Sequence, residues 1–188
     1  MQLVKQFLNK IGRKYILLPE EHAFILNRLF LDFQVEAYNL MKKHKLSYRQ
    51  LDQLVIKHMF PIGVFEFFDS VGIDIMLLSI RNYTRFSAHP KFYQPLIDCL
   101  ADLLGEGRLG QKSKAGFFDY TETIEKADEP EIKNEKELVD RLKLFYVLPI
   151  IDFVKKGICR EDEIDHAFRE YLSVEKGPVT MAKEMGVY

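Results

Sequence analysis

Residues 28–72 and residues 141–186 of this chain look like one unit written twice. The pairs at an offset of 113 (141 minus 28) are Arg28 with Arg141, Leu29 with Leu142, Lys42 with Lys155, Lys43 with Lys156, and Asp52 with Asp165. After one inserted residue, Gly63 recurs as Gly177 and Gly72 recurs as Gly186. A register held over so long a span indicates a duplicated supersecondary unit. We therefore expect two related units, which differ chemically because Asp140 replaces Asn27.

Charge and composition exclude several classes of partner. Apolar residues make up 47% of the 188 positions, and 27 basic residues nearly cancel 28 acidic ones. Such a balance gives no field to attract nucleic acid or an anionic membrane. Charged residues interrupt every apolar run before it reaches spanning length, and the N-terminus lacks a signal-peptide pattern. Cys99 and Cys159 are far apart, which favours buried thiols in a reducing compartment, and we expect a cytoplasmic protein.

The spacing of apolar residues predicts a mostly helical chain. The expected helices cover about residues 2–11, 22–44, 48–58, 65–71, 74–86, 93–104, 137–156, 161–171 and 179–185. Ser47 and Gln50 fit a capping box that would start the third of these helices. The second helix is apolar almost all the way round, which predicts a central or interfacial position. A β-like run at 15–18, a loose hairpin at 105–120 and a linker at 121–136 complete the chain, without the alternation that builds a parallel sheet.

Common catalytic and cofactor-binding motifs are absent from the sequence. No G-x-G-x-x-G follows a strand, and the glycine cluster at 105–110 has the wrong spacing for a dinucleotide site. A P-loop, an H-E-x-x-H motif, a nucleophile elbow and paired cysteine ligands are also missing. The five histidines are scattered and are more typical of surface or capping positions than of catalysis. The sequence therefore predicts no metal-ligating and no cofactor-binding residue in this chain.

Three segments carry a resemblance to a known family. Residues 23–29 (AFILNRL), 63–74 (GVFEFFDSVGID) and 107–120 (GRLGQKSKAGFFDY) occur in this order. Together they resemble the C-terminal helical domain of the 3-hydroxyacyl-CoA dehydrogenases, whose patterns are roughly G-F-I-x-N-R-L, G-P-F-E-L-x-D-x-V-G-L-D and G-x-K-x-G-x-G-F-Y-x-Y. The resemblance covers about residues 1–120. The weaker second copy is similar to the tandem arrangement of long bacterial dehydrogenases and multifunctional β-oxidation subunits. Departures from the patterns are Ala23, Val64, Lys114, Ala115 and Phe118.

This resemblance implies an all-α fold of the 6-phosphogluconate-dehydrogenase C-terminal type, duplicated, with the N-terminal Rossmann domain absent. Residues 1–18 would be the remnant of the end of that Rossmann domain, and 19–120 the helical domain. A linker at 121–136 would lead to a second, truncated copy at 137–188. In the family, the Rossmann domain binds NAD and supplies a catalytic His held by a Glu. The helical domain closes over the acyl chain, supplies an Asn and forms the dimer interface.

By this resemblance, the catalytic Asn maps onto Asn27. A neutral amide can hydrogen-bond a substrate or an imidazole without adding charge. The alternative for Asn27 is an amide that bonds local backbone at a helix start. Lys112 and Lys114 are candidates for contact with CoA phosphates, although lysines of an exposed loop are more often only solvated.

Other conspicuous side chains have structural interpretations. Glu66 and Asp69 invite an acid–base reading, but carboxylates that satisfy backbone N–H groups at a helix start fit their apolar surroundings better. The aromatic positions predicted to belong to the core are Phe30, Phe33, Phe65, Phe67 and Phe68. Part of this set could line an acyl pocket or a dimer face.

The resemblance implies a part of an NAD-dependent enzyme that oxidises (S)-3-hydroxyacyl-CoA, such as 3-hydroxybutyryl-CoA, to the 3-ketoacyl-CoA. We expect this chain alone to be inactive and to need the Rossmann domain of the same enzyme. The expected partners are an acyl-CoA substrate and a second copy in a homodimer, or a pseudo-dimer of the two repeats; nucleic acid and membranes are not expected. The rival hypothesis is a free-standing, non-catalytic helical module for dimerisation or acyl-CoA binding. Acyl-chain length and pathway stay open.

Overall fold

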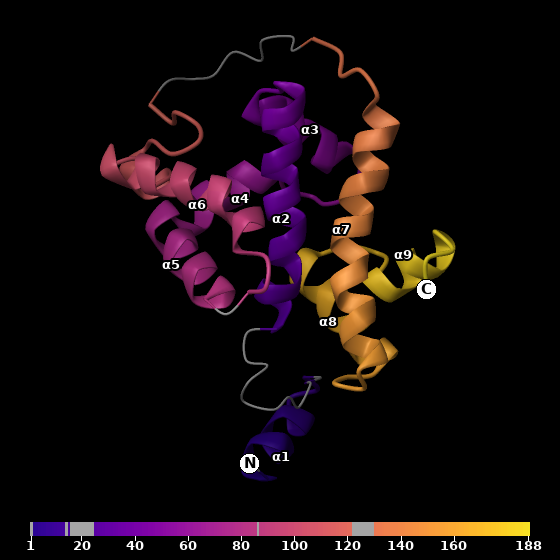
Figure 1. Ribbon diagram of the computed structural model, residues 1–188. Helices are drawn as coiled ribbons and strands as arrows, with labels where there is room; N and C mark the ends of the chain where they lie inside the picture. Colours follow the sequence, from indigo (N-terminus) through magenta and orange to yellow (C-terminus); the bar gives the residue numbers. More distant parts are fainter. Residues whose placement is uncertain (1, 14, 16–24, 86, 122–129) are drawn as a thin grey trace. The chain divides into compact units, whose positions relative to one another are not determined.

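The computed structural model describes residues 2–13, 15, 25–85, 87–121 and 130–188, and the described residues form helices and connecting loops (Figure 1). The chain divides into two compact units. One contains residues 30–145, and the other contains residues 1–29 together with residues 146–188. Helices α2 (Ile25–His44) and α7 (Glu135–Lys155) each run from one unit into the other along the chain.

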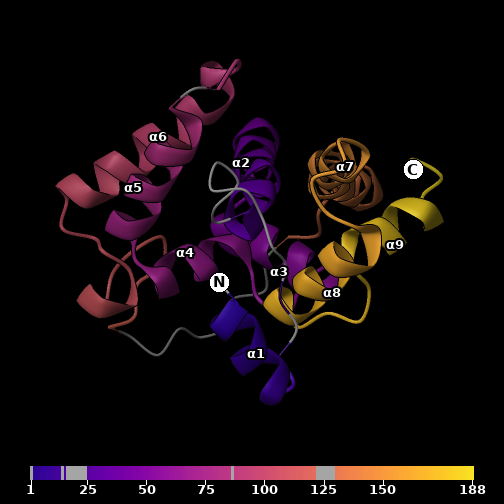
Figure 2. The ribbon, with the colours of Figure 1, turned by 90° about the horizontal axis from the view of Figure 1, so that it is seen from below.

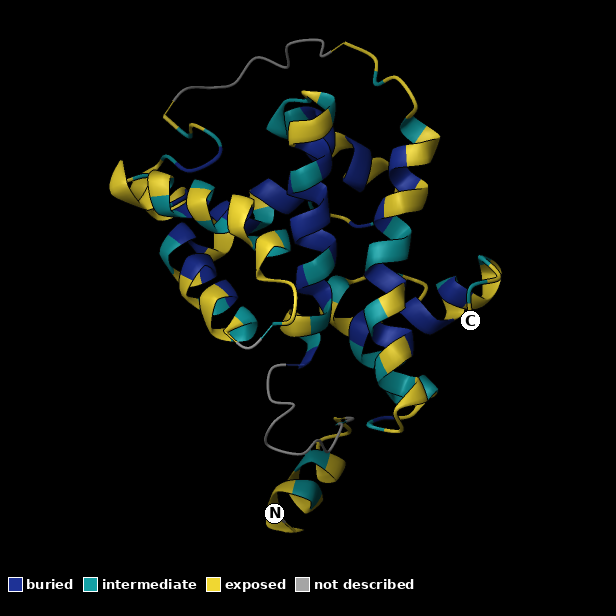
Figure 3. Cartoon of the chain, in the orientation of Figure 1, coloured by how far each residue is buried: buried dark blue, intermediate teal, exposed yellow. Residues whose placement is uncertain are grey.

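The unit of residues 30–145 is built on most of α2. Its other elements are α3 (Tyr48–His58), α4 (Val64–Val71), α5 (Ile73–Thr84), α6 (Pro90–Gly105), the short 3-10 helix η2 (Gln111–Ser113) and the first half of α7. Figures 1 and 2 show α5 and α6 side by side, and the two helices pack on one another. The middle of α2 is buried almost all round (Figure 3), as its all-round apolar pattern predicts.

Aromatic side chains fill the centre of this unit. Phe65 and Phe68 on α4 are completely buried, and both contact the ring of Phe117 in the glycine-rich loop, at centroid distances of 4.8 and 5.8 Å. Phe30 and Phe33 on α2 form a second aromatic group with Phe60. The predicted core positions are therefore confirmed, except that Phe67 is only half-buried. The tilted and edge-to-face arrangements of these rings add to the free energy of burial.

The second unit contains α1 (Gln2–Lys10), the second half of α7, α8 (Glu161–Leu172) and α9 (Pro178–Glu184). Its core centres on Tyr146 of α7 and Phe168 of α8, whose rings meet edge to face at 5.8 Å. Val179 and Ala182 of α9 are buried as well, and α9 packs on α8. By contrast, α1 buries none of its residues, and its apolar side chains, such as Leu3 and Phe7, face solvent (Figure 3).

The expected helices correspond to observed ones with small shifts at their ends. The capping box is confirmed: the Ser47 hydroxyl accepts from the Gln50 amide, and the Gln50 side chain accepts from the Ser47 amide. The loose hairpin appears as a loop with isolated bridges joining Ala115 to Gly110 and to Asp119. The β-like run at 15–18, apart from Tyr15, lies outside the described residues, as do linker residues 122–129 and residues 22–24 and 86 of the expected helices. In the part of the chain that is described, no strand is formed.

One helix–helix corner recurs, once in each unit. In the first, the Asp52 carboxylate on α3 accepts from the backbone N–H of Phe65 (3.0 Å) and Glu66 (2.9 Å), which open α4. In the second, the Asp165 carboxylate on α8 accepts from the N–H groups of Val179 and Thr180, which open α9. Each aspartate thus occupies donors that a helix start leaves unpaired. Both aspartates and the helix starts that they bond lie in the paired segments 28–72 and 141–186. A duplicated unit would repeat such a contact.

Each corner also brings a glycine against its aspartate. A Cβ at Gly63 would lie 2.2 Å from Cγ of Asp52, and a Cβ at Gly177 would lie 2.4 Å from Cγ of Asp165. Such distances are far inside van der Waals contact, so each helix can approach its aspartate only because the glycine has no side chain. The glycines of the repeat therefore serve close approach at these corners.

We expect Gly63→Ala to destabilise the protein by about 1–3 kcal/mol, because the added methyl group has to displace the Asp52 carboxylate from the start of α4. The matched control is Gly105→Ala at the end of α6, where an added Cβ meets nothing within 4 Å. That substitution should be neutral or stabilising by up to about 1 kcal/mol. Urea unfolding of the two variants measures the difference. Equal stabilities would show that the Gly63 approach is unimportant.

Candidate functional site

Asn27 lies in the first turn of α2, and its side chain is exposed. Its Oδ1 accepts a hydrogen bond of 3.0 Å from the hydroxyl of Tyr171, which lies in the last turn of α8. Both residues belong to the same unit although they are 144 positions apart. The Asn27 amide therefore bonds a side chain that is distant in sequence. The alternative considered from the sequence, a bond to nearby backbone at the helix start, did not include such a partner. Sequence reasoning missed Tyr171, because no spacing rule connects it to Asn27.

Asp69 closes the glycine-rich loop onto α4. Its side chain is buried, and its carboxylate accepts from the backbone N–H of Phe117 (2.8 Å) and Phe118 (2.9 Å) and from the Tyr120 hydroxyl (3.0 Å). Burial raises the pKa of Asp69, and the three hydrogen bonds oppose that shift. Gly110 and Gly116 let the loop come this close, because a Cβ at either position would overlap Asp69.

Asp69 satisfies backbone N–H groups, as predicted, but these donors do not belong to a helix start, so that part of the prediction is wrong. Asp69 lies towards the end of α4, and the donors at the start of this helix bond Asp52 instead. Glu66 does lie in the first turn of α4. Burial raises the pKa of Asp52 to about 7, while the hydrogen bonds from Phe65 and Glu66 favour the ionised form. The carboxylates of Asp52 and Asp69 therefore both accept hydrogen bonds from backbone N–H groups and hold backbone segments of this region in place.

Lys112 and Lys114 lie in the same loop and are exposed. The ammonium group of Lys112 pairs with the carboxylate of Asp74, and this ion pair lowers the pKa of Asp74. Lys114 adopts the left-handed backbone conformation, with a φ of 59°, at the point where the resemblance pattern has a glycine. Asn27 and these two lysines belong to different units, and the lysines stay candidates for CoA contact.

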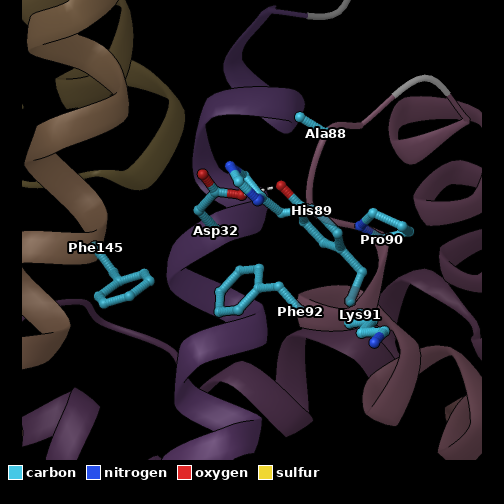
Figure 4. A pocket seen from close by; sticks show the side chains of 8 residues that line it. Asp32, Ala88, His89, Pro90, Lys91, Phe92 and Phe145 are labelled. Atoms are coloured by element: carbon cyan, nitrogen blue, oxygen red, sulfur yellow. Dashed lines mark hydrogen bonds between the residues drawn. The ribbon is translucent and has the colours of Figure 1, made fainter.

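A pocket of about 650 Å³ opens in the unit of residues 30–145 beside the start of α6 (Figure 4). Phe92 and Phe145 form an apolar wall, with nearly parallel rings 5.6 Å apart. Asp32 of α2 supplies a carboxylate that accepts a 2.7 Å hydrogen bond from the hydroxyl of Tyr93. Burial raises the pKa of Asp32, and the bond from Tyr93 opposes this shift. The lining thus combines an apolar wall with a few polar groups, which include His89 and Lys91, as small-molecule pockets commonly do.

No sequence pattern indicated this pocket. Asp32 is one of several polar residues in the mainly apolar middle of α2, together with Gln34 and Glu36, so its presence alone gave no specific signal. The other residues that line the pocket lie 56 to 61 positions further along the chain, at 88–93, and 113 positions further, at Phe145 of α7.

The described residues contain no strand that leads through a glycine-rich turn into a helix, which is the element that binds dinucleotide phosphates in Rossmann domains. Among these residues, no group of three or more His, Cys, Asp or Glu side chains could hold a metal ion. None of the described helices has both the length and the apolar character that a bilayer-spanning helix needs.

Residues 24–120 match the family model of the 3-hydroxyacyl-CoA dehydrogenase C-terminal domain. This match covers more than half of the chain and includes Asn27, Asp69 and the glycine-rich loop. The chain therefore belongs to the family of the 3-hydroxyacyl-CoA dehydrogenase C-terminal domain, as its motifs predict.

Curated relatives agree with this assignment. Mitochondrial hydroxyacyl-coenzyme A dehydrogenase of Sus scrofa is 25% identical over 121 residues, which are 64% of this chain and 38% of that protein. The fatty acid oxidation complex subunit alpha of Shewanella frigidimarina is 26% identical over 185 residues, which are 95% of this chain and 24% of that protein. The chain thus spans well under half the length of these relatives.

A solved structure shares the fold along nearly the whole chain. The crystal structure of 3-hydroxybutyryl-CoA dehydrogenase from Escherichia coli K12 superposes with a TM-score of 0.77 and 16% sequence identity. The similarity covers 98% of this chain and 58% of that protein. Because the match reaches beyond residue 120, the helices of residues 130–188 also have counterparts in that fold, and the predicted all-α class is confirmed.

Proposed function

We propose that this chain forms the C-terminal, substrate-binding part of an NAD-dependent 3-hydroxyacyl-CoA dehydrogenase. The observation that carries the proposal is the family match over residues 24–120, which includes Asn27 in its motif position. The exposed amide of Asn27 is available to a substrate at the surface of its unit. An amide of this kind can hydrogen-bond an oxygen on which charge develops, without titrating itself.

In this proposal, substrate binding and NAD binding belong to different parts of the enzyme. The chain supplies Asn27 and helical surface for the acyl-CoA, and NAD would be bound by a part of the enzyme that lies outside these 188 residues. Lys112 and Lys114 remain proposed contacts for CoA phosphates, because the loop presents both side chains to solvent. The catalytic base also belongs to that other part in this proposal, so the chain alone should not turn over substrate.

Assembly is part of the proposal as well. The paired corners at Asp52 and Asp165 support two copies of one helical unit. We propose that the second copy takes the place that a partner subunit would take in a dimer, since symmetric association repeats one contact twice. The relatives named above include mitochondrial proteins, and the cytoplasmic location predicted from the sequence stays a prediction.

A second candidate is a non-catalytic module for acyl-CoA binding or dimerisation. The pocket beside Asp32 and Phe92 favours this candidate, because it could take a small molecule within the unit of residues 30–145 alone. In this case Asn27 would have no chemical role, and NAD would not be needed.

The deciding experiment measures NADH oxidation with acetoacetyl-CoA, using both the complete gene product and this 188-residue chain. We expect enzyme-like turnover by the complete product, which should be longer by about the size of a dinucleotide-binding domain. The 22.1 kDa chain should be inactive, because it has no dinucleotide-binding element among its described residues. Turnover by the chain alone would contradict the proposal that NAD and the catalytic base belong to another part of the enzyme. A gene product of 22.1 kDa that binds acyl-CoA without turnover would favour the second candidate.

A further inference from the structure

The hydrogen bond between Tyr171 and Asn27 has a direction that matters for chemistry. The Tyr171 hydroxyl is the donor, and Oδ1 of the Asn27 amide is the acceptor. An amide side chain has one acceptor oxygen and an NH₂ group with two donors. With Oδ1 held by Tyr171, the amide is turned so that its Nδ2 hydrogens point away from the hydroxyl. The group that Asn27 presents to a ligand is then a hydrogen-bond donor.

Tyr171 is well placed to hold this orientation. It lies in the last turn of α8, and its ring meets the ring of Phe168 edge to face at 6.4 Å. Phe168 is completely buried and contacts Tyr146 in the core of the same unit. A planar side chain that packs on a fixed ring loses little further rotational freedom when its hydroxyl forms a hydrogen bond. The phenol ring thus connects the exposed amide to the core.

We propose that Tyr171 is a positioning residue, which orients the Asn27 amide so that Nδ2 donates to an oxygen of the acyl-CoA substrate. This inference rests on the proposed function and adds a residue from α8 to the site. A thioester or 3-keto oxygen is an acceptor and matches the NH₂ group that the geometry presents. An amide free to rotate could also turn Oδ1 towards the substrate oxygen, where the two acceptor oxygens repel each other. Tyr171 removes that unproductive orientation.

The test compares Tyr171→Phe with a matched control, Tyr188→Phe, in the complete gene product. Tyr171 and Tyr188 are 37% and 39% exposed and belong to the same unit, and each donates one hydrogen bond, Tyr188 to Glu161. Because a single hydrogen bond orients the amide, Tyr171→Phe should lower kcat for acetoacetyl-CoA reduction roughly 5-fold and leave KM nearly unchanged. Tyr188→Phe should match the unsubstituted enzyme. Equal effects of the two variants would overturn the proposal, because the loss of kcat would then follow from removing any tyrosine hydroxyl of this unit and not from the orientation of the Asn27 amide.

A double-mutant cycle separates positioning from an independent role. If Tyr171 acts through the amide, Tyr171→Phe should have no further effect on kcat once Asn27 is replaced by Ala. Additive losses would overturn the proposal.

A second readout does not need enzyme activity. In the ¹⁵N-labelled 188-residue chain, the side-chain NH₂ signal of Asn27 should shift in Tyr171→Phe and stay in place in Tyr188→Phe. That signal is assigned by its disappearance in Asn27→Ala.

The two proposals fail in different ways. If the complete gene product has no dehydrogenase activity, the proposed function fails, and the positioning role falls with it even where the NH₂ signal shifts. If the enzyme is active and depends on Asn27 but Tyr171→Phe behaves like Tyr188→Phe, only the positioning role of Tyr171 is overturned.

Discussion

Replacing Asn27 by Ala should lower kcat for acetoacetyl-CoA reduction by the complete gene product about 100-fold, the loss typical of removing one preorganised donor from a reacting oxygen. The reason is that the donor acts where charge develops, in surroundings arranged before the reaction begins. The KM should change much less than kcat, because an interaction made mainly in the transition state contributes little to ground-state binding. The rate of NADH loss at saturating substrate measures the effect.

Two further substitutions make this result specific. Asn82→Ala removes an exposed amide from another helix, α5, and should leave kcat unchanged. Asn27→Asp keeps an oxygen for Tyr171 but replaces the NH₂ donors with a negative charge, so it should lose at least as much activity as Asn27→Ala. If Asn27→Asp retained wild-type kcat, a donor role for the amide would be wrong. If Asn27→Ala did so, the catalytic assignment itself would be wrong.

Replacing Asp69 by Ala should destabilise the protein by about 3–5 kcal/mol, since each buried donor left without a partner costs about 1–3 kcal/mol. The substitution removes the common acceptor for the N–H groups of Phe117 and Phe118 and for the Tyr120 hydroxyl. Phe117 packs on Phe65 and Phe68, so a loosened loop also opens the aromatic core. Urea unfolding followed by far-UV circular dichroism measures the loss.

The control for Asp69 lies in the same loop. Asp119 is exposed, and its carboxylate accepts from the backbone N–H and the hydroxyl of Thr121. Asp119→Ala should change stability by less than about 1 kcal/mol, because water can replace the lost acceptor at an exposed site. Asp69→Asn keeps one acceptor oxygen and should fall between the two alanine variants. Equal stability of Asp69→Ala and Asp119→Ala would show that the loop does not depend on the buried carboxylate.

Helix positions were the most predictable part of this fold. The start of α3 follows from Ser47 and Gln50, which are three residues apart and bond each other's backbone. The central position of α2 in its unit follows from an apolar pattern that leaves no polar face. Both signals are local, because helical hydrogen bonds and caps join residues only three or four positions apart. The fold class was predictable for the same reason.

The partners of the polar side chains were much less predictable. Asp69 was expected at a helix start, yet its carboxylate oxygens accept hydrogen bonds from a loop 48 residues further along the chain. The pattern shows that a carboxylate in an apolar segment needs donors, but many backbone N–H groups could supply them. The choice depends on which segments the core brings together, and here Gly110 and Gly116 allow the loop to approach. The pocket at Asp32 and Tyr93 depends on tertiary packing in the same way.

By itself, the sequence determined the helices, the family and the place of Asn27 in its motif, because each depends on residues close together along the chain. Only the tertiary structure decided that Asp52 and Asp165 hold the starts of the next helices, that Asp69 closes the glycine-rich loop, and that Tyr171 meets Asn27. These contacts join residues 13 to 144 positions apart. They form only when apolar burial has brought the helices of a unit together, and no local pattern specifies which donor then faces which acceptor.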